Sequence, residues 1–226
     1  MRVARNRTYR RGSTEEERQR DPERTKARIL RAATELFTRL GPAGASLDEI
    51  SRKAGVQRGL IYHYFKTKES LFEQALSRPL TEYLESHLEF LQIQRLDVDG
   101  LCQATTAFFR FLARNPELVR LLGWVLAMGR AVAPQLDITR ALFARTLRRI
   151  EEAKADGALR SDVDSAHLLI TVIDLCVAWF LTRGEWAERL SWSQRDRTEL
   201  DEERLAAILD LVRAAARPHP AAPAAT

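Results

Sequence analysis

Cysteine and histidine are scarce in this chain, which has two cysteines and four histidines among its 226 residues. Cys102 and Cys176 stand alone within apolar helical patterns, in neither a metal-ligand nor a redox spacing. The four histidines are scattered and provide no second ligand at a suitable spacing. We therefore expect two buried, reduced thiols, no disulfide, no metal site and no other cofactor.

Catalytic motifs and long apolar runs are also absent from the sequence. It contains no G-x-S-x-G elbow, no phosphate-binding glycine loop and no H-E-x-x-H motif. No uninterrupted apolar stretch approaches the roughly 18 residues of a membrane span. The first thirty residues are rich in arginine and lack the apolar core of a signal peptide. We expect a cytoplasmic protein that is not an enzyme and does not enter a membrane.

Positive charge is concentrated at the front of the chain. The whole protein has a formal net charge of +5. Residues 1–78 contain 18 lysines and arginines but only 10 acidic residues, whereas the remainder contains 18 basic and 21 acidic residues. This asymmetry favours a polyanionic partner for the N-terminal segment and a different task for the rest.

The N-terminal pattern predicts an arginine-rich arm followed by an amphipathic helix. Residues 1–20 have no apolar periodicity, and we expect them to be mobile. Asp21-Pro22 is a typical helix start, and apolar residues then recur at helical spacing until Gly41-Pro42. Two roles for the arm remain open: it enters a DNA minor groove, or it is a solvated tail.

Two short helices separated by a tight turn follow the first helix. Ser46 and Glu49 form the S-x-x-E pattern of a capping box at the start of one helix, and Gly55 can end it in the left-handed conformation. Another helix is predicted from about residue 57 to residue 65. The three helices define a domain at residues 21–67, in which the last helix can be presented to a DNA major groove.

The rest of the chain is predicted to be helical as well, so the fold class is all-α. Helices are expected from about 68 to 95, after Asp99, from Asn115-Pro116, near Pro134, from 168 to 181 with an end at Gly184, and from 201 to 216. Residues 68–216 would form a helical ligand-binding and dimerisation domain. The Pro/Ala-rich residues 217–226 should be a disordered tail.

A dense set of motifs in the first third of the chain resembles a known DNA-binding domain. The segments are residues 24–30 (RTKARIL), 36–37 (LF), Gly41, 46–50 (SLDEI), 54–56 (AGV) and 60–72 (LIYHYFKTKESLF). They resemble the helix-turn-helix domain of TetR-family regulators. The resemblance implies an all-helical homodimer with a variable C-terminal ligand domain, which represses transcription until a small molecule binds.

The resemblance also implies roles for individual residues in binding double-stranded DNA. It places phosphate contacts at Ser46, Tyr62, Tyr64 and Lys68, and base or groove contacts at Arg58, Gly59 and His63. Lys66 adds a cation beside this set. Gln57 departs from the serine or threonine common in the family, so its contact with DNA is open. A different interpretation of the aromatic run at 62–64 is that it packs against the next helix.

The C-terminal domain has no motif that names a ligand, but its composition suggests a pocket. Phe108, Trp124, Met128 and Trp179 are aromatic or adaptable side chains that could line a cavity for a hydrophobic effector. Asp174 interrupts a strongly apolar run. A buried carboxylate is costly without a partner, so Asp174 could anchor a ligand, pair with an arginine or face a second subunit.

Dimerisation is expected through the last two long helices. Leu205, Ile208, Leu209 and Val212 form an apolar stripe that we expect an isolated subunit to expose. A two-fold dimer would present two recognition helices to a palindromic operator. The alternative is a DNA-binding regulator of the same fold that is controlled by a protein partner or by no ligand.

Overall fold

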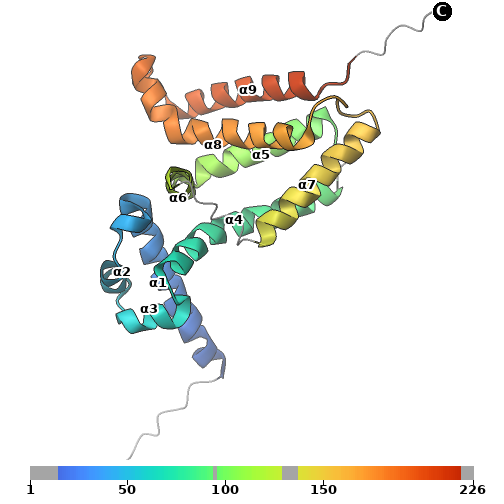
Figure 1. The fold of residues 1–226 in the computed structure, drawn as a ribbon. Helices are drawn as coiled ribbons and strands as arrows, with labels where there is room; N and C mark the ends of the chain where they lie inside the picture. The colour runs from blue at the N-terminus through green and yellow to red at the C-terminus, as the bar shows by residue number, and fades with distance from the viewer. Residues whose placement is uncertain (1–14, 94–95, 129–136, 220–226) are drawn as a thin grey trace, which may run out of the picture. The chain divides into compact units, whose positions relative to one another are not determined.

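The computed structural model describes residues 15–93, 96–128 and 137–219, and every regular element in these ranges is an α-helix. The chain divides into two compact units, residues 1–72 and 73–226. The helix order can be followed from the blue to the red end of the ribbon (Figure 1). The all-α prediction is confirmed for the described residues.

The N-terminal unit contains α1 (Glu15–Gly44), α2 (Leu47–Ala54), α3 (Arg58–Phe65) and the start of α4 (Lys68–Ile93). Its core is built from apolar residues that recur on one side of each helix. They are Ile29, Ala33, Phe37, Ile50, Ile61, Phe65 and Leu71, each at most 1% exposed. The Phe37 and Phe72 rings meet edge to face at 5.2 Å, which ties α1 to the first turns of α4.

The first helix begins earlier than predicted and is interrupted where its end was predicted. It begins at Glu15, six residues before Asp21, so residues 15–20 are helical and do not belong to an arm. Three glutamates open the helix, where negative charge is favourable at the positive end of the helix dipole. Gly41 interrupts the helix with φ 72°, a conformation that favours glycine. Residues 1–14 of the predicted arm lie outside the described residues.

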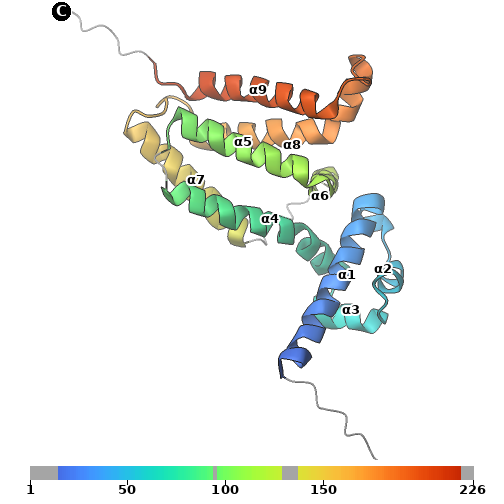
Figure 2. The same cartoon turned by 180° about the vertical axis from the view of Figure 1, so that it is seen from behind.

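The C-terminal unit contains the rest of α4 and five further helices. These are α5 (Val98–Arg114), α6 (Pro116–Ala127), α7 (Asp137–Ala155), α8 (Ser165–Arg189) and α9 (Arg197–Ala216). α5 packs against both α8 and α9, and α8 also contacts α6 and α7. Figure 2, which views the molecule from the opposite side, shows α5, α8 and α9 running alongside one another. Cys102 and Cys176 are buried free thiols within this unit, as predicted.

The apolar helix α8 is longer than predicted. Asp164 caps its start by accepting a hydrogen bond from the His167 amide at 2.8 Å. The helix continues through Gly184, which does not adopt the positive φ that ends α2 at Gly55. By length and composition alone α8 could cross a membrane. However, residues such as Val172, Cys176 and Phe180 are buried in the core, which is how a central helix of a globular domain behaves.

The apolar stripe predicted on the last helix does not lie on the surface. Leu205, Ile208 and Val212 are at most 3% exposed, and Leu209 packs against the same core. The stripe fills the space between α9 and α5 of its own chain. The prediction that an isolated subunit exposes it is therefore wrong, because helical periodicity identifies a buried face without saying which chain buries it.

Candidate DNA-binding site

The start of α2 is fixed by a complete capping box. The Ser46 Oγ accepts a hydrogen bond from the Glu49 amide, and the Glu49 carboxylate accepts one from the Ser46 amide, both at 3.2 Å. The Ser46 hydroxyl also donates to Glu49 Oε2 at 2.9 Å. These hydrogen bonds lower the pKa of Glu49 below its ordinary value, because they stabilise the ionised carboxylate. The predicted capping box is confirmed.

The turn after α2 sets the direction in which the next helix leaves. Gly55 adopts the left-handed conformation with φ 63°, and the Val56 amide donates to the Ser51 carbonyl at 3.0 Å. Arg28, from α1, donates hydrogen bonds to the carbonyls of Ala54 and Gly55 at 3.0 and 3.1 Å. The first helix therefore holds the turn through hydrogen bonds from its Arg28 side chain to backbone carbonyls.

The helix α3 buries one face and exposes the other. Ile61 and Phe65 are each 1% exposed and anchor α3 in the core of its unit. Arg58 and Tyr62 lie on the exposed face four residues apart, and Tyr62 is 42% exposed. Lys66 follows the helix as its exposed C-terminal cap, with φ 62°. Side chains spaced by four lie on one side of a helix. This face is therefore available to a molecule outside the unit.

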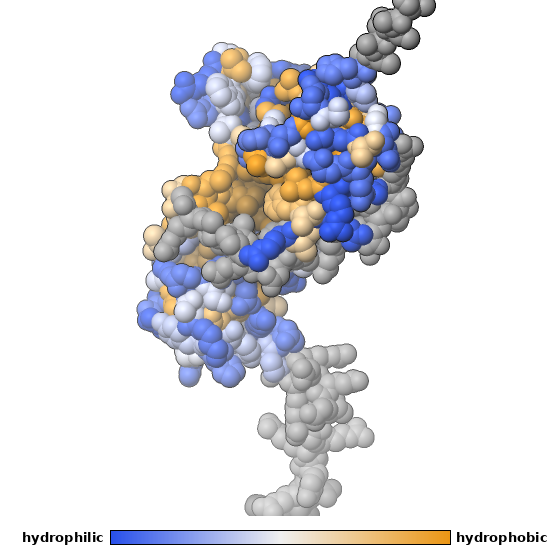
Figure 3. Space-filling view, turned by 45° about the vertical axis from the view of Figure 1, so that its right-hand side comes forward, coloured by the Kyte–Doolittle hydropathy of each residue, from blue (hydrophilic) through white to orange (hydrophobic). Residues whose placement is uncertain are grey.

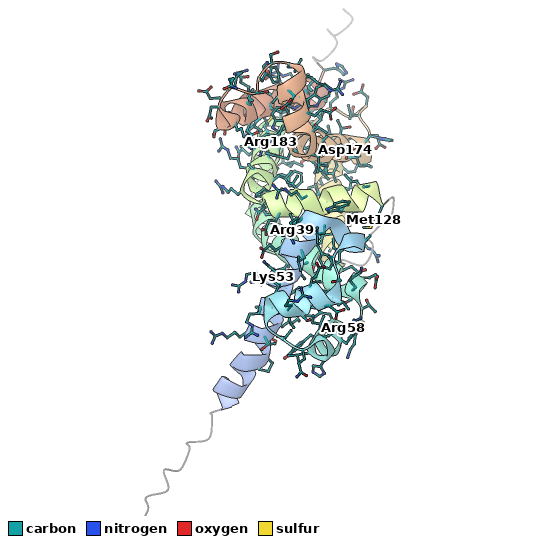
Figure 4. All side chains as sticks on the ribbon, turned by 90° about the vertical axis from the view of Figure 1, so that its left-hand side faces the viewer. Arg39, Lys53, Arg58, Met128, Asp174 and Arg183 are labelled. Atoms are coloured by element: carbon teal, nitrogen blue, oxygen red, sulfur yellow. The ribbon has the colours of Figure 1, made fainter. Side chains whose placement is uncertain are left out.

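Arg58 is already held in place in the free protein. Its Nη1 donates to both carboxylate oxygens of Asp48, at 3.1 and 3.0 Å, and its Nη2 donates to the Tyr62 hydroxyl at 3.0 Å. The hydrogen bond with Tyr62 and the charge of Asp48 raise the pKa of the guanidinium. Figure 4 labels Arg58 on the outer side of the N-terminal unit.

A cleft of about 390 Å³ lies beside this arginine. Five of the nine residues predicted to contact DNA line it: Ser46, Arg58, Tyr62, Lys66 and Lys68. The Lys68 ammonium donates to the Ala45 carbonyl at 3.3 Å, so this lysine is fixed at the cleft wall. Three cations and three hydroxyls, those of Ser46, Tyr62 and Thr67, line this cleft together with the carboxylates of Asp48 and Glu69. The cations and hydroxyls are suitable partners for a phosphate.

The other four predicted residues lie outside the cleft. Gln57, Gly59 and His63 are exposed on or beside α3, whereas Tyr64 is half-buried. The His63 and Tyr64 rings meet edge to face at 5.2 Å. Part of the Tyr64 side chain thus packs within the unit, and its contact with DNA stays a prediction.

Asp48 and Arg28 are site residues that the sequence analysis missed. Asp48 follows the cap residue of α2, yet its partner Arg58 lies ten residues later on another helix. Arg28 reaches the α2 turn from 26 residues away. Local patterns carry no signal for such contacts, since they depend on how the three helices are packed together.

The residues predicted to line a ligand pocket do not gather in one place. Figure 3 shows apolar surface around a hollow in the molecule. Trp124 and Met128 are 37% and 38% exposed near the end of α6, and Phe108 packs against the core. Trp179 is buried and lines a different cavity of about 630 Å³. That cavity is not lined by Phe108, Trp124 or Met128.

The prediction that Asp174 is a buried carboxylate is also wrong. The side chain is exposed on the outward face of α8, and it has no ion pair or hydrogen bond within the described part of the chain. Figure 4 labels it apart from Arg183, which lies further along the same helix. Asp174 therefore is not a buried carboxylate within its subunit. It interrupts the apolar run because it belongs to the side of α8 that faces away from the core.

Comparison with known families agrees with this architecture. Residues 29–75 match the family described as bacterial regulatory proteins, tetR family. Residues 100–217 match the tetracyclin repressor-like C-terminal domain. The two matches cover the helix-turn-helix and most of the C-terminal unit.

Individual relatives support the same assignment. The chain is 30% identical over 155 residues to the HTH-type transcriptional repressor SCO4008 of Streptomyces coelicolor, covering 68% of this chain and 77% of that protein. It is 29% identical over 159 residues to the HTH-type transcriptional repressor NicS of Pseudomonas putida, covering 68% and 74%.

The fold also matches solved structures. The putative transcriptional regulator SCO4942 from Streptomyces coelicolor superimposes with a TM-score of 0.65 at 27% identity, covering 85% of this chain and 98% of that one. This family contains DNA-binding regulators and not enzymes. The chain belongs to the TetR family of bacterial transcriptional regulators.

Proposed function

We propose that this regulator is a homodimeric repressor, which binds a palindromic operator and is released from it by a small, largely hydrophobic molecule. The observation that carries its DNA-binding part is the exposed surface of α3 and its C-terminal cap, where Arg58, Tyr62 and Lys66 line one cleft. Two relatives named as repressors, SCO4008 and NicS, favour repression over activation. Such a regulator acts in the cytoplasm, where bacterial DNA is found.

The DNA contacts fall into two groups. Ser46, Tyr62, Tyr64, Lys66 and Lys68 contact phosphates, because hydroxyls and cations bind the backbone without regard to sequence. Arg58, Gly59, His63 and Gln57 form the part of α3 that enters the major groove, where an arginine can donate two hydrogen bonds to guanine. Gly59 supports this role, since a side chain there would meet no atom within 4 Å. Packing within the free protein thus does not require a glycine.

The proposed dimer uses the outward face of α8 and α9. A groove of about 440 Å³ runs between the two helices and is lined by Ala178, Thr182 and Trp186 from α8 and by Glu203 and Ala207 from α9. Leu211, one turn after Ala207, is 55% exposed. A second copy related by two-fold symmetry would cover this face and place two α3 helices on one operator.

The DNA-binding part can be tested with purified full-length protein and the DNA upstream of its own gene. Tyr62→Ala and Lys68→Ala should weaken binding to many sequences, because each removes a backbone contact. Arg58→Ala should mainly relax base preference, by about 1–3 kcal/mol if the contact is bidentate. Gel-shift titrations at fixed salt, against operator and scrambled DNA, measure both effects. If all three variants bind like the parent, α3 is not the recognition helix.

The release part needs a separate measurement on the same complex. A small hydrophobic effector should dissociate the protein from its operator and leave the protein folded. A protein that no small molecule releases, but a protein partner does, would support the alternative mode of control.

A further inference from the structure

A cavity of about 630 Å³ lies between the end of α5, the start of α6, the last turns of α8 and the first turns of α9. All of these segments belong to the C-terminal unit. The volume is within the range of about 300–1,000 Å³ that is usual for small-molecule sites. Only Trp179 among the predicted ligand residues lines it. The other lining residues therefore determine which ligand the cavity can bind.

Arg183 lines this cavity and is held in place by two neighbours. It forms an ion pair with Asp201, and its guanidinium lies over the Phe180 ring at 5.0 Å from the centroid. Its side chain is 29% exposed. Only its Nη1 has a hydrogen bond with a described residue, although a guanidinium has five N–H donors. Arg183 is thus held in one orientation while most of its donors remain open.

Three further arginines line the cavity, of which Arg195 is paired with Glu203. Arg120 belongs to α6 and Arg197 to α9, and both side chains are exposed. Neither has an ion-pair partner among the described residues. Of the acidic residues in the lining, Asp201 is paired with Arg183 and Glu185 with Arg189, which leaves Glu188. The unpaired charge around the cavity is therefore positive.

The uncharged part of the lining is mainly apolar and includes three aromatic side chains. Trp179 is 7% exposed, and its indole N–H donates to Asp201 Oδ1 at 2.8 Å. Phe180 and Trp192 also line the cavity. Because Asp201 satisfies the indole N–H, the rings present mainly their apolar surfaces. Such walls favour a ligand with an apolar body, and the arginines favour a negative head on it.

We infer that this cavity binds an organic carboxylate with an apolar body, whose head pairs with Arg183 and Arg120. The inference rests on the proposed ligand response and narrows the effector from a hydrophobic molecule to a hydrophobic acid. The bound carboxylate would share Arg183 with Asp201, and Asp201 is the residue of α9 that contacts Arg183 and Trp179 of α8. Ligand binding would therefore alter a contact between the two helices that carry the proposed dimer face.

The site can be tested by calorimetric titration of the full-length protein without DNA. The probes are decanoate and 1-naphthaleneacetate, each compared with its primary amide, which has the same body and no charge. Both acids keep the carboxylate, and their bodies distinguish an acyl from an aryl ligand. We expect at least one acid to bind at least about tenfold more tightly than its amide, since a charge-assisted pair is lost in the amide.

Variants then locate the binding. Arg183→Gln and Arg120→Gln should each weaken binding of the acid by about tenfold or more and leave the amide unchanged. Arg148→Gln, an exposed arginine on α7 outside the cavity, should bind like the parent. Thermal melts show whether each variant is folded, and Arg120 on the exposed rim provides a variant that does not disturb the Asp201 contact.

Three results would overturn the inference. They are acids and amides that bind equally, acid binding that survives both substitutions, and no binding of either acid at about 1 mM. None of these results depends on DNA, so the site can fail while operator binding stands. An acid that binds the free protein but does not release the operator would contradict the proposed release and keep the site.

Discussion

We propose that recognition of a DNA sequence depends most on Arg58. In the free protein it is held by Asp48 and Tyr62, so its guanidinium is oriented before DNA arrives. Both members of the pair are exposed, at 50% and 62% of their side chains. Ion pairs in such surroundings stabilise a protein little, so Arg58 can exchange Asp48 for a base at small cost.

Gly59 provides a test in which stability and DNA binding should move in opposite directions. Alanine favours the helix, and nothing lies within 4 Å of the added carbon. Gly59→Ala should therefore raise the free energy of unfolding by about 0.4–1 kcal/mol. The same methyl group lies where the backbone of α3 would approach DNA, so affinity for the operator should fall. Thermal melts and gel shifts on one preparation measure both quantities.

A control for this prediction is available elsewhere in the chain. Gly184 also lies in a helix with open space around it, but it belongs to the C-terminal unit. Gly184→Ala should stabilise the protein without changing operator affinity. If Gly59→Ala binds DNA as tightly as Gly184→Ala does, Gly59 does not face the operator.

Asp174 shows what could not be inferred at the scale of one residue. Its sequence neighbours are apolar, so the sequence pattern predicts burial. The structure places the side chain in solvent within its own chain. A helix of a small domain buries only part of its circumference, and a single charged residue in an apolar run can mark the outward part.

The helix boundaries show how far local sequence reaches at the scale of an element. The capping box at Ser46 and the left-handed Gly55 were predictable, because caps and turns depend on side chains a few residues apart. The end of α8 was not, since glycine permits a helix end without requiring one. Cysteine burial followed from the same helical patterns.

The capping box of α2 predicts a pH dependence. Hydrogen bonds from Ser46 lower the pKa of Glu49 in the folded protein. The stability that this carboxylate contributes is therefore present above its unfolded pKa and is lost as the pH falls through the lower, folded pKa. Glu49→Gln should be less stable than the parent at neutral pH, and the difference should shrink in acid.

Urea unfolding at several pH values measures this difference. Glu23→Gln is the matched control, because Glu23 is exposed on α1 and has no ion pair within the described residues. Its effect should be small at every pH. A Glu49→Gln effect that is constant from neutral to acidic pH would show that the carboxylate does not stabilise α2 through its charge.

At the scale of the whole molecule, the assembly is the part that sequence periodicity described least well. Leu205, Ile208 and Val212 are one apolar stripe, but α5 of the same chain covers it. The face left for a second copy is more mixed in character, with alanines, threonine and Leu211 beside charged side chains. Sequence alone could indicate two amphipathic helices there, but not which of their sides meets a partner.

The proposed dimer face can be tested by placing negative charge on it. Ala178→Glu combined with Leu211→Glu should yield a folded monomer. Both side chains are exposed within the subunit, and in the proposed dimer the new carboxylates would lie unpaired in the interface. Sedimentation and circular dichroism report mass and folding. Leu126→Glu, at an exposed leucine on α6, should remain dimeric. A double variant that is still dimeric would move the interface elsewhere.

Two copies of this chain are proposed to bind one palindromic operator through α3. Selection of bound duplexes from a random DNA pool, followed by sequencing, tests this proposal. The parent should enrich an inverted repeat with half-sites separated by about one helical turn or a multiple of it. Arg58→Ala should bind the same pool with weaker preference at fixed positions of each half-site. Enrichment of a single, unrepeated site, or no enrichment at all, would contradict the claim.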